Sequence, residues 1–255
     1  MKSSMRLKDK IAIVTGAGVG IGVEYCQRFA REGARVVCAD IDGGNAERTA
    51  KEILAAGGEA IGFKTDVARK VDTDAMAQRS KDQYDRIDIL VNNAAMFTAL
   101  PEGPFDELTE ENWDRCMEVN LKGVWNCIRS VFPFMKEQRY GKIINISSVT
   151  WMMGRPYRLD YVTSKAGVVG LTHALAPELG EYGINVNSLV LGLVQSDSAL
   201  KVYGSKHFNT FKERQVFKRS LTPQDVCGAA VFMASEDAEM ITGQSLVVDG
   251  GLVFH

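Results

Sequence analysis

Short apolar runs rich in β-branched residues alternate along this chain with longer amphipathic stretches. Seven runs are expected to be strands, at residues 11–16, 35–40, 60–66, 87–94, 142–148, 184–192 and 245–251. Runs of this length without polar interruption are typical of parallel strands that are buried on both faces. The alternation therefore predicts right-handed βαβ units and an α/β fold, with a doubly wound sheet of seven parallel strands flanked by helices.

The domain organisation follows from what does not interrupt this pattern. No linker rich in Pro, Gly or Ser and no internal repeat is found in the 255 residues, so residues 1–255 are interpreted as a single domain. Residues 193–219 differ, because they lack a strand pattern and are rich in Lys, Arg and aromatic residues. This segment is long for a plain connection and is predicted to be a lid over a substrate site.

Charge and cysteine content exclude several classes of function. A formal net charge of -2 without a basic run gives no attraction for nucleic acid, and no apolar run approaches the roughly 20 residues of a membrane helix. The first apolar run is too short for a signal peptide. The cysteines contain no CxxC spacing, so neither a zinc site nor a disulfide framework is expected and a cytoplasmic location is predicted. They are Cys26, Cys38, Cys116, Cys127 and Cys227.

A glycine-rich turn, TGAGVGIG at residues 15–22, directly follows the first expected strand and opens the first expected helix. Glycine at 16, 20 and 22 permits a close backbone approach, while the N-terminus of a helix offers unpaired N–H groups and a positive dipole to a pyrophosphate. The pattern alone also fits a plain tight turn.

An acid, Asp40, ends the second expected strand 24 positions after Gly16. This offset is close to that of acids that bind the adenosine ribose hydroxyls of a dinucleotide. Its charge would repel a 2′-phosphate, and neither Val19 nor Ile41 and Asp42 supplies a cation to receive one. The sequence therefore favours NAD over NADP, although a solvated acid at a strand end is the simpler alternative.

With these motifs in place, the chain resembles the short-chain dehydrogenase/reductase family from about Leu7 to Gly251. The glycine turn is similar to TGxxxGxG, NNAA at 92–95 to NNAG, YVTSK at 161–165 to YxxxK, and VNSLVLG to the N-x-x-x-P-G element of the sixth strand. The departures are Ala95, Leu191 and Pro177; the proline predicts that its helix kinks or ends near His173 to Pro177.

The resemblance implies a Rossmann-type fold and the catalytic set Asn120, Ser148, Tyr161 and Lys165. Asn120 lies 28 positions before Ser148, which lies 13 before Tyr161, as the family pattern expects. Together with the glycine turn and the acid, the expected cofactor contacts are Gly16, Gly18, Val19, Gly20, Ile21, Asp40, Ile41, Asp66, Val67, Asn93, Ala94, Ala95, Tyr161, Lys165, Gly192 and Val194. Asp66 alternatively fits the N-cap of the next helix.

Residues four apart on a helix share a face, so Tyr161 and Lys165 are expected to reach the same bound molecule. A free tyrosine has a pKa of about 10, and a neighbouring ammonium together with a positive nicotinamide would lower it and make Tyr161 a proton acceptor. Ser148 ends the fifth expected strand and is placed to hydrogen-bond the substrate oxygen, whereas Ser147 faces the other way. Asn120, by resemblance, holds a water that links Lys165 to solvent.

The expected substrate contacts are aromatic or apolar: Met96, Phe97, Trp151, Tyr157, Tyr203 and Phe208. They suit an apolar, aromatic or cyclic secondary alcohol or ketone, although each also fits plain core. The ending DAEMITGQSLVVDGGLVFH and the stretch FDELT at 105–109 resemble those of family members that oxidise such alcohols with NAD, such as 1-phenylethanol dehydrogenase, and also of pyridoxal 4-dehydrogenase. The alternatives are a 3-oxoacyl-carrier-protein reductase, a pyridoxal or sugar alcohol dehydrogenase, an NAD-binding regulatory protein and a structural subunit. The resemblance implies a homotetramer, or else a dimer.

Overall fold

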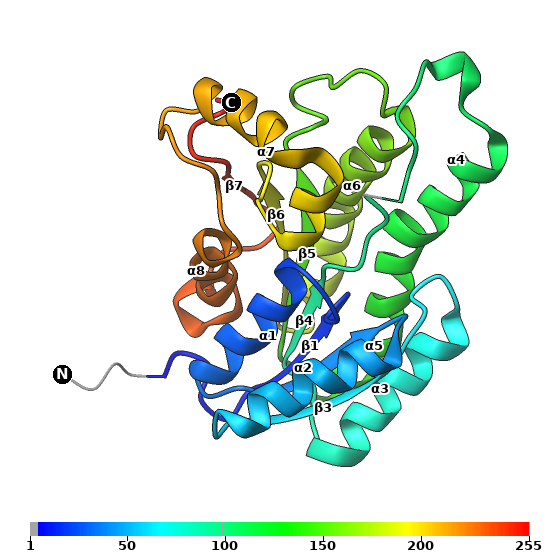
Figure 1. Ribbon diagram of the computed structural model, residues 1–255. Coiled ribbons are helices and arrows are strands. Elements are labelled where there is room, and N and C mark those ends of the chain that lie inside the picture. Colours follow the sequence, from blue (N-terminus) through cyan, green and yellow to red (C-terminus); the bar gives the residue numbers. More distant parts are fainter. Residues whose placement is uncertain (1–4, 98, 255) are drawn as a thin grey trace.

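The chain folds around one seven-stranded parallel sheet in a computed structural model that describes residues 5–97 and 99–254 (Figure 1). The strands are β1 (Ile11–Thr15), β2 (Arg35–Asp40), β3 (Glu59–Lys64), β4 (Ile89–Asn92), β5 (Gly141–Ser148), β6 (Ile184–Leu191) and β7 (Ser245–Val248). Their order across the sheet is β3-β2-β1-β4-β5-β6-β7, and every neighbouring pair is parallel. The predicted doubly wound fold is confirmed.

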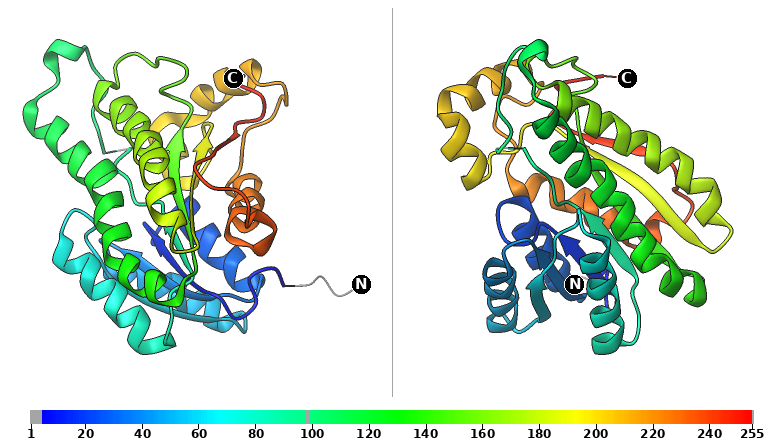
Figure 2. Two further views of the ribbon diagram at one scale, coloured as in Figure 1. Left: turned by 180° about the vertical axis from the view of Figure 1, so that it is seen from behind. Right: turned by 90° about the vertical axis from the view of Figure 1, so that its right-hand side faces the viewer.

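Helices cover both faces of this sheet, as the views from behind and from the side show (Figure 2). They are α1 (Ile21–Arg31), α2 (Gly43–Ala55), α3 (Lys70–Tyr84), α4 (Glu110–Met117), α5 (Gly123–Gln138), α6 (Leu159–Gly180), α7 (Asp197–Arg214) and α8 (Pro223–Ala234). Apolar side chains of α1, α2 and α8 form the core on one face, and those of α3, α5 and α6 form the core on the other. Across the residues that the structure describes, none of these helices combines the length and apolar character needed to span a membrane.

The strands are apolar without interruption because neighbouring residues enter two different cores. Ile13 of β1 packs against α3 and α5, whereas Val14, the next residue, packs against α1. Ile143 and Ile144 of β5 divide in the same way. A strand that is buried on both faces has no solvent side to carry polar residues, so the period-two alternation is absent.

The strand order reverses between β1 and β4, and this reversal places the site. From β1 the chain builds outward through β2 and β3, then returns to pair β4 with the other edge of β1. The connections on the two sides therefore leave in opposite directions at the carboxyl ends of these strands. Ligands of doubly wound sheets bind in the resulting crevice.

Pro177 does not end its helix, so the predicted end near His173 to Pro177 is wrong. Helix α6 continues through Pro177 to Gly180. Proline removes one N–H group and thereby leaves the carbonyl of residue 173 without its helical partner. Because His173 lies on the exposed side of α6, water can bind that carbonyl, and only about one turn of helix remains beyond it.

Candidate active site

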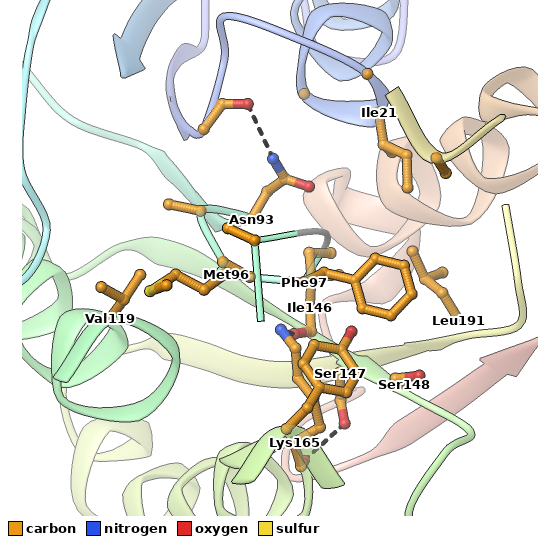
Figure 3. A pocket seen from close by; sticks show the side chains of 18 of the residues that line it. Ile21, Asn93, Met96, Phe97, Val119, Ile146, Ser147, Ser148, Lys165 and Leu191 are labelled. Atoms are coloured by element: carbon orange, nitrogen blue, oxygen red, sulfur yellow. Dashed lines mark hydrogen bonds between the residues drawn. The ribbon is translucent and has the colours of Figure 1, made fainter. Parts of the chain in front are cut away.

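A cavity of about 870 Å³ lies at the carboxyl edge of the sheet. Six consecutive strands each bring a residue to its wall from the position at or just after the strand end. These residues are Gly16, Asp40, Asp66, Asn93, Ser148 and Gly192. Figure 3 shows side chains from several of these segments converging on this space. The cavity is within the size range of small-molecule and cofactor sites.

The glycine turn forms one wall of the cavity. Gly16 has φ +65°, and a Cβ on it would lie 2.8 Å from the Cα of Ala94. Gly20, with φ 61°, precedes α1 and supplies no side-chain cap to that helix. The first N–H groups of α1 therefore lack a side-chain acceptor where Gly20, Ile21 and Gly22 line the cavity. This arrangement fits a bound phosphate group.

Two side chains fasten the glycine turn to the end of β4. The Thr15 hydroxyl accepts hydrogen bonds from the backbone N–H groups of Asn93 and Ala94, each at 3.1 Å. In return, Asn93 Nδ2 donates to the carbonyls of Thr15 at 2.9 Å and Gly16 at 3.2 Å. Thr15 was not predicted as a site residue, although its place at a strand end beside the turn is a signal that the sequence does carry.

Asp40 is held firmly at the far end of the same wall. Its Oδ2 accepts from Gly18 N at 2.8 Å and its Oδ1 accepts from Asp42 N at 2.9 Å. Gly18 touches this acid without lining the cavity itself. A cation from outside the loop also lies beside it. Arg48 of α2 donates a hydrogen bond from Nη2 to the Gly18 carbonyl at 2.7 Å.

The wall beyond Asp40 continues through the residue after β2 to the residues after β3. Ile41, Asp66 and Val67 all line the cavity. Asp66 is not the N-cap of α3, because Arg69 holds that place; its Oδ1 instead accepts from Ala68 N at 3.0 Å. Thr65 lies on the same wall with a buried hydroxyl that has no hydrogen-bond partner among the described residues. Such an orphaned hydroxyl, with the glycine cradle, fits a dinucleotide.

The predicted catalytic hydroxyls and amine come from β5 and α6. Ser148, Tyr161 and Lys165 all line the cavity, and the Ser148 hydroxyl lies near enough to the Tyr161 phenol to influence its pKa. Lys165 Nζ donates to the Ile146 carbonyl at 2.8 Å. The Ser147 hydroxyl points the other way, as predicted, and donates to the Lys165 carbonyl at 2.8 Å, which fixes α6 to β5 (Figure 3).

Burial dominates the protonation of this group. It raises the pKa of Tyr161 far above the usual value, while the Ser148 hydroxyl and the charge of Arg158 oppose that rise. It also lowers the pKa of Lys165 to about 8. A neighbouring ammonium was predicted to lower the pKa of Tyr161. The protein alone instead raises this pKa, because loss of hydration outweighs nearby positive charge. At neutral pH the phenol carries its proton and can donate it.

Asn120 lies behind the cavity, where it is fully buried and does not line the wall. It occupies a π-helical turn, Glu118–Lys122, between α4 and α5. Its Oδ1 accepts from Met96 N at 2.7 Å, and its Nδ2 donates to Met96 O at 3.0 Å and Ser164 Oγ at 3.2 Å. Asn120 thus holds the segment after β4 against α6. Its predicted role in holding a water stays a prediction.

Of the predicted substrate contacts, two lie on the cavity wall. Met96 and Phe97 line it, and the Phe97 ring centroid is 4.9 Å from that of Tyr161. The other predicted contacts, Trp151, Tyr157, Tyr203 and Phe208, are not part of the lining. Trp151 packs on the cluster around Val149, Tyr157 is 63% exposed, Tyr203 stacks behind Phe97 at 5.3 Å, and Phe208 is buried elsewhere.

Three further side chains line this end of the cavity; Met153 and Phe211 lie in segments that the sequence predicts as pocket wall and lid, whereas Arg155 was not predicted. Met153 and Arg155 come from the segment after β5, and Phe211 comes from α7. Arg155 is the one charge within VTWMMGRPY, residues 149–157, and that isolation was an available signal. The sequence does not indicate which of Phe208 and Phe211 lines the cavity, because both lie in a segment without a strand pattern.

Residues 193–219 consist mainly of α7 and contribute several residues to the cavity wall. Val194 forms an isolated bridge with Leu221, and α7 is broken at Gly204, where φ is 66°. Gly192 and Val194, both predicted cofactor contacts, line the cavity, as do Val19, Gly20, Ile21, Ala94 and Ala95. The lid function of this segment stays a prediction. No group of three or more potential metal ligands occurs in residues 5–97 and 99–254.

Comparison with known proteins identifies the family. Residues 16–253 match the family model adh_short_C2, described as "Enoyl-(Acyl carrier protein) reductase". The protein (2S)-[(R)-hydroxy(phenyl)methyl]succinyl-CoA dehydrogenase subunit BbsD of Thauera aromatica is 38% identical over 97% of this chain and 98% of its own length. The chain belongs to the short-chain dehydrogenase/reductase family and is an oxidoreductase of that family.

Other relatives have different substrates in their names. The 3-oxoacyl-(acyl-carrier-protein) reductase FabG of Thermotoga maritima is 36% identical over 98% of this chain and 100% of its own length. Galactitol 2-dehydrogenase of Agrobacterium fabrum is 38% identical over 97% of this chain and 98% of its own length. The resemblance to 1-phenylethanol dehydrogenase in particular stays a prediction.

Proposed function

We propose that this protein is an NAD(H)-dependent alcohol dehydrogenase/reductase that transfers a hydride between the nicotinamide and a secondary alcohol or ketone. One observation carries the proposal: Ser148, Tyr161 and Lys165 share a cavity wall with the glycine turn and Asp40. A single cavity can therefore hold a dinucleotide and a small substrate next to a proton donor. NAD supplies the hydride chemistry when it is bound.

The chain's own residues would move the proton and orient the substrate. The Tyr161 phenol donates its proton to the substrate oxygen during reduction and takes it back during oxidation. The Ser148 hydroxyl, which lines the cavity beside that phenol, steadies the same oxygen as charge develops. Lys165 lies one turn further along α6 and is the residue placed to bind ribose hydroxyls and to influence the phenol. Asn120 supports this group through Met96 and Ser164.

The choice of NAD rests on Asp40. Its two carboxylate oxygens are fixed by Gly18 and Asp42, so a negative charge faces the position expected for the adenosine ribose. Such a charge favours two ribose hydroxyls and repels a 2′-phosphate. Arg48 is the competing influence, because its half-exposed guanidinium, 53% accessible, lies on the other side of Gly18. We place the acid first because its side chain lines the cavity.

The proposed substrate body is apolar, aromatic or cyclic. Phe97, Met153 and Phe211 supply the apolar part of the wall near Tyr161. The name of the Thauera relative describes an alcohol with a phenyl group, which supports an aryl substrate here. The similarity to FabG favours the second candidate, a 3-oxoacyl-carrier-protein reductase, and galactitol 2-dehydrogenase favours a sugar alcohol.

Replacing Tyr161 by Phe tests the proposal. We expect Tyr161→Phe to lower turnover of an aryl ketone by about 10²- to 10⁴-fold, because the proton donor is lost, while NADH binding measured by fluorescence is retained. Tyr157→Phe is the matched control, since Tyr157 is 63% exposed and lies off the cavity wall. Full activity of Tyr161→Phe would reject the assignment. Rates with NADH and NADPH, measured side by side, separate the dehydrogenase from the carrier-protein reductase.

Assembly and location are also part of this proposal. We propose a homotetramer, with a dimer as the alternative, and a small-molecule alcohol or ketone as the only required partner, without nucleic acid or membrane. A cytoplasmic setting agrees with five free cysteines, all of them buried. Light scattering of the purified protein measures the subunit number directly.

A further inference from the structure

One arginine lies in the otherwise apolar half of the cavity. Arg155 lines the wall with Phe97, Met153 and Phe211, and its guanidinium carbon is 5.7 Å from the Phe211 ring centroid. Its side chain is only 15% exposed. A cation enclosed among apolar groups loses hydration, which costs free energy. A ligand anion bound there would offset part of that cost.

The charges around Arg155 do not balance. Its Nη2 donates to Glu102 Oε1 at 3.0 Å, and Arg158 Nε donates to the same oxygen at 2.9 Å. Two guanidinium groups therefore share one carboxylate. His207, stacked nearby on Tyr203, adds no charge near neutral pH, because burial and Arg155 lower its pKa. One positive charge is left over in this group.

The two arginines differ in how many of their donors are already used. Arg158 is 2% exposed and donates to Glu102, to the carbonyls of Phe97 and Leu100, and to the Tyr203 hydroxyl. Arg155, by contrast, donates from its guanidinium only to Glu102 among the described residues. A guanidinium has five N–H donors in a planar fork that matches a carboxylate. Arg158 is therefore part of the scaffold, whereas Arg155 has donors left at the cavity wall.

A second arginine on the cavity wall lacks these features. Arg115 of α4 is exposed, and Glu111, Asp114 and Glu118 line the cavity around it. The local charge there is negative, so Arg115 does not form an anion site. It is also the natural control for Arg155.

We propose that Arg155 binds a carboxylate of the substrate, so that the substrate class is a secondary hydroxy acid, or its keto acid, with an apolar body. The body packs on Phe97, Met153 and Phe211 while the carboxylate takes the unused donors of Arg155. This inference rests on the proposed oxidoreductase function and narrows its substrate. Helix α7 borders this part of the cavity, because its Phe211 ring lies against the Arg155 guanidinium and its Tyr203 hydroxyl accepts a hydrogen bond from Arg158.

The test compares an acid with its neutral ester. Oxidation of 3-hydroxy-3-phenylpropanoate and of its methyl ester is measured with the wild-type protein, Arg155→Met and Arg115→Met. We expect wild type to prefer the acid in kcat/KM. The acid-to-ester ratio should fall by about 10- to 100-fold in Arg155→Met, the range for a hydrogen bond to a charged group. It should stay within about threefold of wild type in Arg115→Met, because that arginine does not face the substrate anion.

A binding measurement keeps the inference separate from the reaction. Calorimetric titration of wild type with 3-phenylpropanoate and with its methyl ester should show tighter binding of the carboxylate, and Arg155→Lys should retain part of that preference. If the carboxylate binds through Arg155 but no alcohol is oxidised with either nicotinamide cofactor, the proposed reaction fails and the carboxylate site stands. If the ester is oxidised and bound as well as the acid, the carboxylate site is overturned while the reaction stands. Equal loss of acid and ester activity in Arg155→Met, with the ratio unchanged, would also overturn it, because Arg155 would then act only by holding Glu102.

Discussion

Lys165 is a buried ammonium group, and its burial should make the active protein less stable than an inactive variant. The side chain is 3% exposed, and burial lowers its pKa from 10.5 to about 8. The folded state therefore binds this proton less tightly than the unfolded state does. A difference of about 2.5 between the two pKa values, at about 1.36 kcal/mol each, costs about 3 kcal/mol of stability below pH 8. Above about pH 10.5 both states are neutral and the cost disappears.

Replacing Lys165 by Met removes this cost while keeping most of the side-chain volume. The hydrogen bond from Nζ to the Ile146 carbonyl is also lost, which is worth about 1 kcal/mol. The free energy of unfolding should therefore rise by about 2 kcal/mol near pH 7, although activity is lost. Wild type gains stability as Lys165 deprotonates, so the advantage of Lys165→Met should shrink by about 2 kcal/mol between about pH 7 and about pH 9.5.

Urea unfolding of both proteins at the two pH values measures this difference. Lys51→Met is the control, because Lys51 is exposed on α2 and far from the cavity wall. Its pH dependence should follow wild type. The reasoning is refuted if Lys165→Met is less stable than wild type near pH 7, or if the two differ equally at both pH values.

Two further substitutions probe the framework of the site. Gly16→Ala should lower the melting temperature and weaken NADH binding, because its Cβ would lie 2.8 Å from the Ala94 backbone. Gly57→Ala is the control, because Gly57 has φ +84° but no atom within 4 Å of the added Cβ. It should cost only the backbone strain of about 1 kcal/mol and leave NADH binding unchanged. Asn120→Leu should lower the free energy of unfolding in urea by about 2 kcal/mol, because it leaves the Met96 N–H and carbonyl unpaired. It should also lower kcat by more than tenfold. A variant with wild-type kcat would show that Asn120 takes no part in the reaction.

Much of the fold follows from the sequence because strand burial has a local signature. The run at 142–148 was expected as a strand, and β5 is Gly141–Ser148. The strand expected at 87–94 is longer than the observed strand β4, which is Ile89–Asn92. The excess at its start is Ile87 and Asp88, and the Asp88 carboxylate caps the first strand by accepting from Ile11 N at 2.9 Å. A side-chain contact with another strand decided that boundary, and local composition does not report it.

The two halves of the candidate site differ in how far the sequence specifies them. The carboxyl ends of parallel strands meet at one edge, so the sequence alone predicts that residues such as Asp40 and Asn93 lie close together. The substrate half depends on the path of the segment after β5. There, Gly154 at φ +59° and Tyr157 at φ +63° turn the chain, so Tyr157 points to solvent while Arg155 lines the cavity. These turns lie outside any periodic pattern. The sequence therefore does not indicate whether Arg155 or Tyr157 lines the cavity.

This division has a physical origin in what holds each half. Helix α6 is fixed to the centre of the sheet by buried hydrogen bonds, from Asn92 to Asn145 at 2.8 Å and from Asn145 to Thr172 at 3.0 Å. The Tyr161 phenol on α6 is therefore tied to the core. The substrate half is held instead by Glu102 and its arginines and by a helix that is broken at Gly204. Substitutions there can change the bound molecule without moving Tyr161, which is how relatives of 36% and 38% identity can differ in the substrates that their names describe.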